Sequence, residues 1–229
     1  MQDKLNLFIA LAPIINLANS PNDVMQKAAK YWHKLESTLS FFKLYELKDS
    51  DTDSKMRAFC GTFASLCSAI NSFLNIGPSP WNDPAICAVD DARPSSSASL
   101  KQVVHYGQIF DTGVFKQYDW GNDKENTEHY GNNIVPLLSL YTIDKVPIAY
   151  FVGLHDDLGD PTDTAYTYKQ IKTAFTYKLY NDMDHYSFQV GRDMRYVDDV
   201  LELLGQYNTE EPVELPPKKE MKLEDLMLY

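Results

Sequence analysis

Basic residues, cysteines and long apolar runs are all scarce in this chain of 229 residues. The 21 lysines and arginines are outnumbered by 32 aspartates and glutamates, and the net charge of −11 disfavours nucleic acid and anionic membranes as partners. No apolar run approaches the roughly 18 residues that span a bilayer, so we expect no transmembrane segment. Residues 1–6 also lack the cationic head and long apolar segment of a secretory signal peptide.

The three cysteines, Cys60, Cys67 and Cys87, do not form a metal-binding signature. No pair has the two-residue spacing of zinc knuckles, and no histidine is placed to complete a ligand set, so we expect no metal and no other cofactor. A regular helix would hold Cys60 and Cys67 about 10 Å apart, so a disulfide between them needs a bend in the backbone. Free thiols are the equal alternative.

Hydrophobic residues make up 44% of the chain and aromatic residues 13%, which is enough for a folded protein with a sizeable core. Three apolar runs are typical of strands in a parallel sheet of an α/β protein: Leu5–Pro13, Val146–Gly153 and Phe175–Tyr180. The first is near-continuous, as in strands that are buried on both faces. An exposed edge on this first strand would make the isolated chain self-associate.

The other apolar patterns follow the period of a helix, and residues 20–115 contain no strand of comparable quality. The predicted helices are Val24–Leu47, Met56–Leu74, a helix that Ser95–Ser99 opens and that continues to Phe110, and the amphipathic Met194–Gln206. The chain is therefore expected to comprise a core strand and exit loop (1–19), a helical insertion (20–120), an α/β core (121–207) and a mobile acidic tail (208–229).

Asp156 and His185 follow the second and third predicted strands, each in a polar loop. In open parallel sheets, ligands bind outside the carboxyl ends of the strands, so we expect these two side chains to meet at one site. An aspartate beside an imidazole orients the ring, and the imidazole can then act as a base. The neighbouring Asp157 is the competing acid.

More ordinary roles are expected for the other polar residues near these loops. Asp160 precedes Pro161 and is a good cap for the following helix, whereas Asp182 and Asp184 are expected to face solvent. Structural roles are also expected for the remaining histidines, which are a surface residue, His33, and three residues that pack or hydrogen-bond locally, His105, His129 and His155.

Several segments, in order and at similar spacing over residues 5–206, resemble the acid lipases, which are the gastric, lingual and lysosomal lipases and their sterol-ester relatives. These segments are Leu7–Pro13, Ser97–Gln108, Gly113–Gly121 with its Tyr-Asp-Trp-Gly turn, Val146–Ala149, Gly153–Asp160 and Asp184–Phe188. The resemblance implies the last strands of an α/β-hydrolase fold, with residues 20–120 as a helical cap. The N-terminal half of that fold is not represented in the chain.

The resemblance also implies a function for the two loop residues. Matching the Gly-x-x-Asp pattern from Gly153 selects Asp156 as the triad acid, and His185 becomes the base of an ester hydrolase that acts on neutral lipids. The aromatic residues of the insertion would then line an acyl-chain pocket, although aromatic residues at helical spacing are more often core. They include Tyr31, Trp32, Phe41, Phe42, Tyr45, Phe59, Phe63 and Phe73.

One part of the expected machinery is missing from the sequence. The chain contains no Gly-x-Ser-x-Gly nucleophile elbow, and the family's oxyanion-hole strand has no counterpart either. The nucleophile would therefore come from an upstream lipase segment. The alternative is a non-catalytic remnant that binds lipid or a partner, or a truncated gene product. The resemblance implies a lysosomal or secreted protein, whereas residues 1–6 give no expectation of a signal peptide.

Overall fold

The computed structural model describes residues 2–42, 45–47, 79–91, 98–208 and 217–218. The chain divides into two compact units. The first comprises Met1–Ser20, Ser79–Cys87 and Ser139–Tyr229, and the second comprises Pro21–Pro78 and Ala88–Leu138.

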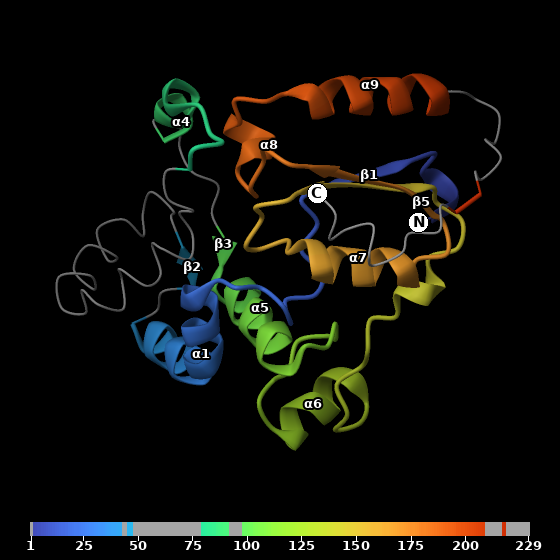
Figure 1. Ribbon diagram of the computed structural model, residues 1–229. Helices are drawn as coiled ribbons and strands as arrows, with labels where there is room; N and C mark the ends of the chain where they lie inside the picture. The colour runs from blue at the N-terminus through green and yellow to red at the C-terminus, as the bar shows by residue number, and fades with distance from the viewer. Residues whose placement is uncertain (1, 43–44, 48–78, 92–97, 209–216, 219–229) are drawn as a thin grey trace. The chain divides into compact units, whose positions relative to one another are not determined.

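A three-stranded parallel sheet forms the centre of the first unit (Figure 1). β4 (Ile148–Gly153) lies in the middle, between β1 (Phe8–Leu11) and β5 (Ala174–Tyr180). The three strands coincide with the three predicted runs to within a few residues. The predicted α/β character is therefore confirmed.

Burial differs sharply between the middle and the edge of this sheet. Every residue of β4 is buried, because the strand has a neighbour on each side and helices over both faces. In β1, by contrast, Phe8 is 49% exposed and Leu11 is 40% exposed. Within the described residues, β1 lies at the edge of the sheet. The expectation that this strand is buried on both faces is therefore wrong.

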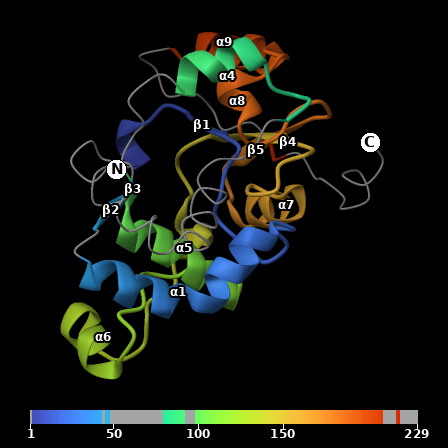
Figure 2. The same ribbon diagram turned by 90° about the vertical axis from the view of Figure 1, so that its left-hand side faces the viewer.

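Helices cover the two faces of the sheet, as Figures 1 and 2 show. α7 (Pro161–Gln170) lies on one face, where the rings of Tyr168 and Tyr150 pack edge to face with centroids 5.8 Å apart. On the other face, α8 (Ser187–Val190) and α9 (Arg195–Tyr207) enclose a core with β4 and β5. α9 matches the predicted closing helix. The short helices η1 and η2 span Gln2–Lys4 and Leu140–Thr142.

In the described part of the second unit, the helices α1 (Asp23–Phe41) and α5 (Leu100–Thr112) pack side by side (Figure 2). Ser99 caps α5 by accepting the N–H of Gln102, which confirms the helix start predicted from the serine run. The unit also contains α6 (Asp123–Tyr130), and α4 (Pro84–Asp91) spans the boundary between the units.

The helix predicted over Val24–Leu47 is too long at its C-terminal end. α1 stops at Phe41, and β2 (Glu46–Leu47) pairs antiparallel with β3 (Ala98–Ser99). The carbonyl of Tyr45 accepts the N–H of Leu100 at 2.8 Å, so this backbone bonds to a distant segment rather than within a helix. The helix predicted over Met56–Leu74 lies outside the described residues.

Candidate functional site

The ends of β4 and β5 bring two loops of the first unit together. Gly153 and Tyr180 are partners in the strand register, and beyond them the N–H of Leu154 donates to the carbonyl of Tyr180 at 2.9 Å. The N–H of His155 then donates to the carbonyl of Met183 at 3.0 Å. The two loops therefore leave the sheet side by side.

Asp156 and His185 form a hydrogen bond between these loops. The distance from His185 Nδ1 to Asp156 Oδ2 is 3.0 Å. Asp156 is 2% exposed, and its other oxygen, Oδ1, accepts the backbone N–H groups of Leu158 at 2.8 Å and Gly159 at 2.6 Å. A buried carboxylate is stable only when it is hydrogen-bonded in this way.

This geometry determines what the imidazole can do. An ionised carboxylate only accepts hydrogen bonds, so His185 donates to it from Nδ1 and keeps a lone pair on Nε2. The His185 side chain is 25% exposed, whereas that of Asp156 is fully enclosed. The pair can therefore act as a base that is held in one tautomer by a buried acid.

Two glycines allow the loops to approach this closely. A Cβ atom on Gly153 would lie 2.5 Å from the carbonyl oxygen of Met183. On Gly159 it would lie 2.9 Å from Asp156 Oδ2 and 3.1 Å from the carbonyl oxygen of Pro13. Any larger residue at either position would have to displace backbone or the acid itself.

The competing acid, Asp157, is exposed, and the imidazole bonds to Asp156 instead. Partial desolvation of its carboxyl by the surrounding chain raises the pKa of Asp157, and the nearby charge of Asp156 raises it further. Asp160 has the predicted role, because it accepts the N–H groups of Thr162 and Asp163 at the start of α7.

The two aspartates of the histidine loop differ from each other. Asp182 is exposed as expected, but the expectation that Asp184 faces solvent is wrong. Asp184 is 5% exposed and accepts hydrogen bonds from Asn82 and Ser187. The spacing of apolar residues along the sequence cannot predict the burial of Asp184, because its partner Asn82 lies 102 residues away.

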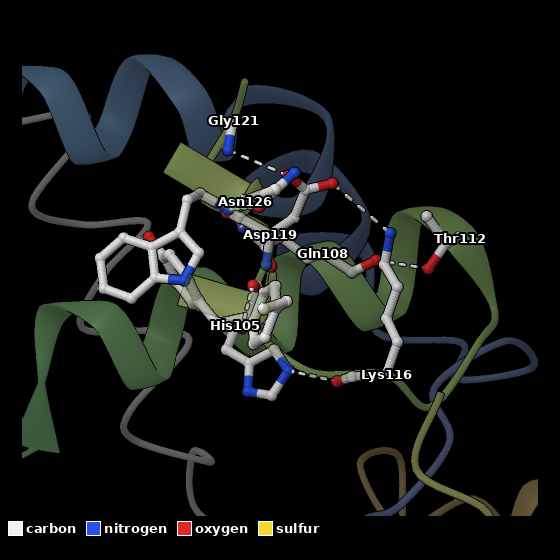
Figure 3. Close-up of polar contacts among 10 residues, drawn as sticks. His105, Gln108, Thr112, Lys116, Asp119, Gly121 and Asn126 are labelled. Atoms are coloured by element: carbon white, nitrogen blue, oxygen red, sulfur yellow. Dashed lines mark hydrogen bonds and ion pairs between the residues drawn. The ribbon is translucent and has the colours of Figure 1, made fainter. Parts of the chain in front are cut away.

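The other histidines pack locally wherever their side chains are described. The ring of His155 stacks on Trp81, with centroids 4.5 Å apart and planes at 9°. In the second unit, His129 stacks on Trp120 at 3.6 Å, and His105 Nε2 bonds to the carbonyl oxygen of Lys116 at 2.7 Å (Figure 3).

Figure 3 also shows why the Tyr-Asp-Trp-Gly turn is well defined. Gln108 donates to the carbonyl of Asp119 at 2.7 Å and accepts its N–H at 2.8 Å. Asp119 in turn accepts the N–H of Gly121 and the side chain of Asn126. This network ties α5 to the turn within the second unit, and we assign it a structural role.

The structure describes only some of the predicted pocket aromatics and cysteines. Among residues with described side chains, Tyr31, Phe41, Phe42 and Tyr45 are exposed. The other predicted pocket aromatics, the His33 side chain, Cys60 and Cys67 lie outside the described residues or side chains. Cys87 is a free thiol.

Neither a metal site nor a membrane span is found within the described ranges. There, no group of three or more histidine, cysteine, aspartate or glutamate side chains is placed to hold a metal ion. Of the helices described, none is long and apolar enough to cross a membrane.

Comparison with known proteins finds relatives whose names include the word lipase. The chain is 35% identical over 115 residues to human lipase member N, covering 49% of this chain and 29% of that protein. It is 25% identical over 214 residues to human lipase member K, covering 89% of this chain and 52% of that protein. The rat lysosomal acid lipase/cholesteryl ester hydrolase is 26% identical over 214 residues, with the same coverage of 89% and 52%.

The chain is therefore similar to lipases, and one of these relatives is named a lysosomal acid lipase. No family model matches the chain. The chain spans about half the length of lipase member K, at 52%, and 29% of the length of lipase member N. The alignment that covers 89% of the chain is long enough that both units contribute to the relationship.

Proposed function

We propose that this acid-lipase relative contributes the acid and the base of a serine hydrolase that cleaves carboxylic esters of neutral lipids. The observation that carries the proposal is the hydrogen bond from His185 Nδ1 to the buried Asp156, because it leaves Nε2 as a base beside the ends of the strands. A serine hydroxyl must lose a proton as it attacks an ester carbonyl, and a neutral imidazole is the usual acceptor.

The two residues have separate roles in this reaction. His185 takes the proton from the nucleophile and then returns it to the departing alcohol. Asp156 holds the imidazole in the required tautomer and stabilises its protonated form, while its own charge is satisfied by the N–H groups of Leu158 and Gly159. The reaction requires no metal or other cofactor.

The nucleophile must come from elsewhere, because the sequence contains no Gly-x-Ser-x-Gly motif. Ser187 is close to His185 along the chain, but it is 0% exposed and bonded to Asn82 and Asp184. We therefore propose that an upstream lipase segment, covalently joined or separate, supplies the serine and the oxyanion hole.

The same proposal extends to the architecture and the substrate. The sheet of the first unit corresponds to the last strands of an α/β-hydrolase fold, residues 20–120 to its helical cap and residues 208–229 to an acidic tail. A triacylglycerol and a sterol ester are both substrates of this chemical class. The name of the rat relative, which includes cholesteryl ester hydrolase, supports the sterol ester as one substrate to test.

A non-catalytic role in binding lipid or a partner is the second candidate, and the missing nucleophile motif favours it. The hydrolase role and the binding role predict different results when a nucleophile is supplied to the chain. The N-terminal part of human lipase member K, up to the matched segment, can be fused ahead of this chain and assayed against short-chain and long-chain p-nitrophenyl esters.

Hydrolysis by the fusion that falls at least about 10³-fold in His185→Ala would support the hydrolase. The chain without the added segment serves as the control and should show no turnover. A soluble fusion that binds lipid vesicles but reacts with neither ester nor a serine-directed fluorophosphonate would favour the binding role.

A further inference from the structure

A short segment of the first unit, Ser79–Asp83, precedes both loops of the candidate site in sequence and bonds to the chain beyond the histidine loop. The N–H of Asp83 donates to the carbonyl of Val190 at 2.8 Å, and the N–H of Arg192 donates to the carbonyl of Trp81 at 2.9 Å. Asn82 forms an antiparallel bridge with Gly191. The segment Ser79–Asp83 is therefore bonded by its backbone to the chain that follows α8.

The side chain of Asn82 reaches further, to the residues that flank His185. It is 3% exposed, its Nδ2 donates to Asp184 Oδ2 at 3.3 Å, and its Oδ1 lies 2.8 Å from Ser187 Oγ. Asp184 and Ser187 are also bonded to each other, through the Ser187 N–H at 2.9 Å and the Asp184 N–H at 3.0 Å. Asn82, Asp184 and Ser187 thus form a closed ring of hydrogen bonds, and two of its members lie on either side of His185 in the sequence.

Because the ring is buried, each of its polar groups needs a hydrogen-bond partner within the protein. Ser187 is 0% exposed and Asp184 is 5% exposed, so a missing partner would leave a buried polar group unpaired. The Ser187 hydroxyl has one hydrogen, which faces both Asn82 Oδ1 and Asp184 Oδ1 at 2.8 Å. Removing the Asn82 amide leaves the Asp184 carboxylate without one of its donors.

The residue before Asn82 contacts the other loop. Trp81 stacks on His155 with the rings almost parallel, and His155 immediately precedes Asp156. The backbone of His155 is in turn bonded to Met183 of the histidine loop. Two consecutive residues of one segment therefore touch both loops of the candidate site.

We propose that Trp81 and Asn82 are positioning residues that hold the acid loop and the histidine loop at the separation required for the bond between Asp156 and His185. Trp81 fixes the acid loop through the ring of His155, and Asn82 fixes the histidine loop through Asp184 and Ser187. This inference rests on the proposed roles of Asp156 and His185, but it concerns their geometry and can be tested without turnover.

The test uses the whole chain, labelled with ¹⁵N, and follows the ring N–H of His185 by NMR. In the wild-type chain the hydrogen bond to Asp156 should give a downfield Nδ1–H resonance that is protected from solvent exchange. In Asn82→Ala we expect that resonance to disappear, or its exchange rate to rise at least about tenfold, the effect of losing one such bond.

Asn16→Ala is the matched control, because Asn16 is also buried in the first unit, at 8% exposure, and bonds Asp163 and Leu17 away from His185. It should lower stability comparably and leave the resonance unchanged. Trp81→Ala should also increase exchange, whereas Trp81→Phe, which retains an aromatic ring against His155, should restore most of the protection.

If Asn82→Ala prevents folding, Asn82→Leu is the second variant, since it keeps the shape of the side chain without adding a charge and removes the Nδ2 donor and the Oδ1 acceptor. An unchanged resonance and exchange rate in the folded Asn82 variant would overturn the positioning role while the acid and base pair remains. Absence of the protected resonance from the wild-type chain would instead contradict the bond on which the proposed function depends.

Discussion

Replacing Gly153 by alanine tests whether the two loops approach as closely as the candidate site requires. Gly153 is the last residue of β4, and its Cα faces the backbone of the histidine loop. An added Cβ would lie 2.5 Å from the carbonyl oxygen of Met183, 2.9 Å from its carbonyl carbon and 3.1 Å from the carbonyl oxygen of Asp184. Backbone atoms cannot rotate away as a flexible side chain could.

The expected loss of stability has two parts. The Met183 carbonyl accepts the N–H of His155 at 3.0 Å, and moving it away sacrifices a bond worth about 1 kcal/mol. Overpacking of a tight site costs about 1–3 kcal/mol in addition. We therefore expect Gly153→Ala to lower the free energy of unfolding by about 2–4 kcal/mol, the sum of these two contributions.

Urea denaturation followed by circular dichroism measures this loss, and the His185 ring resonance reports on the loop itself. Gly205→Ala is the control, because a Cβ there meets nothing within 4 Å and lies in the helix α9. Alanine should stabilise that helix by about 0.5–1 kcal/mol. A Gly153→Ala chain as stable as the wild type, with an unchanged His185 resonance, would refute the close approach.

Three further predictions concern single side chains. Asp160→Ala should remove the cap of α7 and lower the free energy of unfolding by about 1 kcal/mol in urea denaturation, and no change would show that the cap is not formed in solution. Asp157 has a pKa raised above its ordinary value of 3.8, first by partial desolvation of its carboxyl and then by the charge of Asp156, so its ionisation opposes folding as pH rises through the raised value. Asp157→Asn should therefore melt at a higher temperature than the wild type at pH 7, and the difference should vanish below the ordinary pKa; a pH-independent difference would contradict this assignment. The exposed edge strand β1 should make the chain self-associate, and Phe8→Lys, which places a charge at a residue that is 49% exposed, should reduce light scattering; equal scattering would exclude this edge as the cause.

The parts of the site that the sequence predicts are those with local signals. The strand that ends at Gly153 and the strand that ends at Tyr180 each have an apolar run followed by loop residues, and parallel pairing then brings Asp156 and His185 together. The cap at Asp160 is likewise a local pattern. For these features the structure and the sequence agree in detail.

The parts that the sequence does not predict depend on distant partners. Asn82 lies 105 residues from Ser187, and nothing in the composition around it distinguishes it from a loop residue. Burial of Asp184 follows from that contact, so the expectation of a solvent-facing aspartate was wrong for the same reason. The strand β2 was missed because it consists of two residues that pair with a segment about 50 positions later.

The buried position of Ser187 indicates a structural role for this residue in the histidine loop. A serine two residues after the proposed base could be taken for a nucleophile, but its hydroxyl is fully buried and bonded to Asn82 and Asp184. Ser187→Ala should therefore disturb the His185 loop without removing a reacting atom. This role is consistent with a nucleophile supplied by a different segment.

The most direct test of the central claim is ester hydrolysis by the fusion that supplies the missing nucleophile, compared between wild type and His185→Ala at equal folded concentration. The proposed roles of Asp156 and His185 predict turnover by the wild-type fusion and a loss of at least about 10³-fold in the variant. Equal ester hydrolysis by the wild-type and His185→Ala fusions would contradict the claim that this residue is the base.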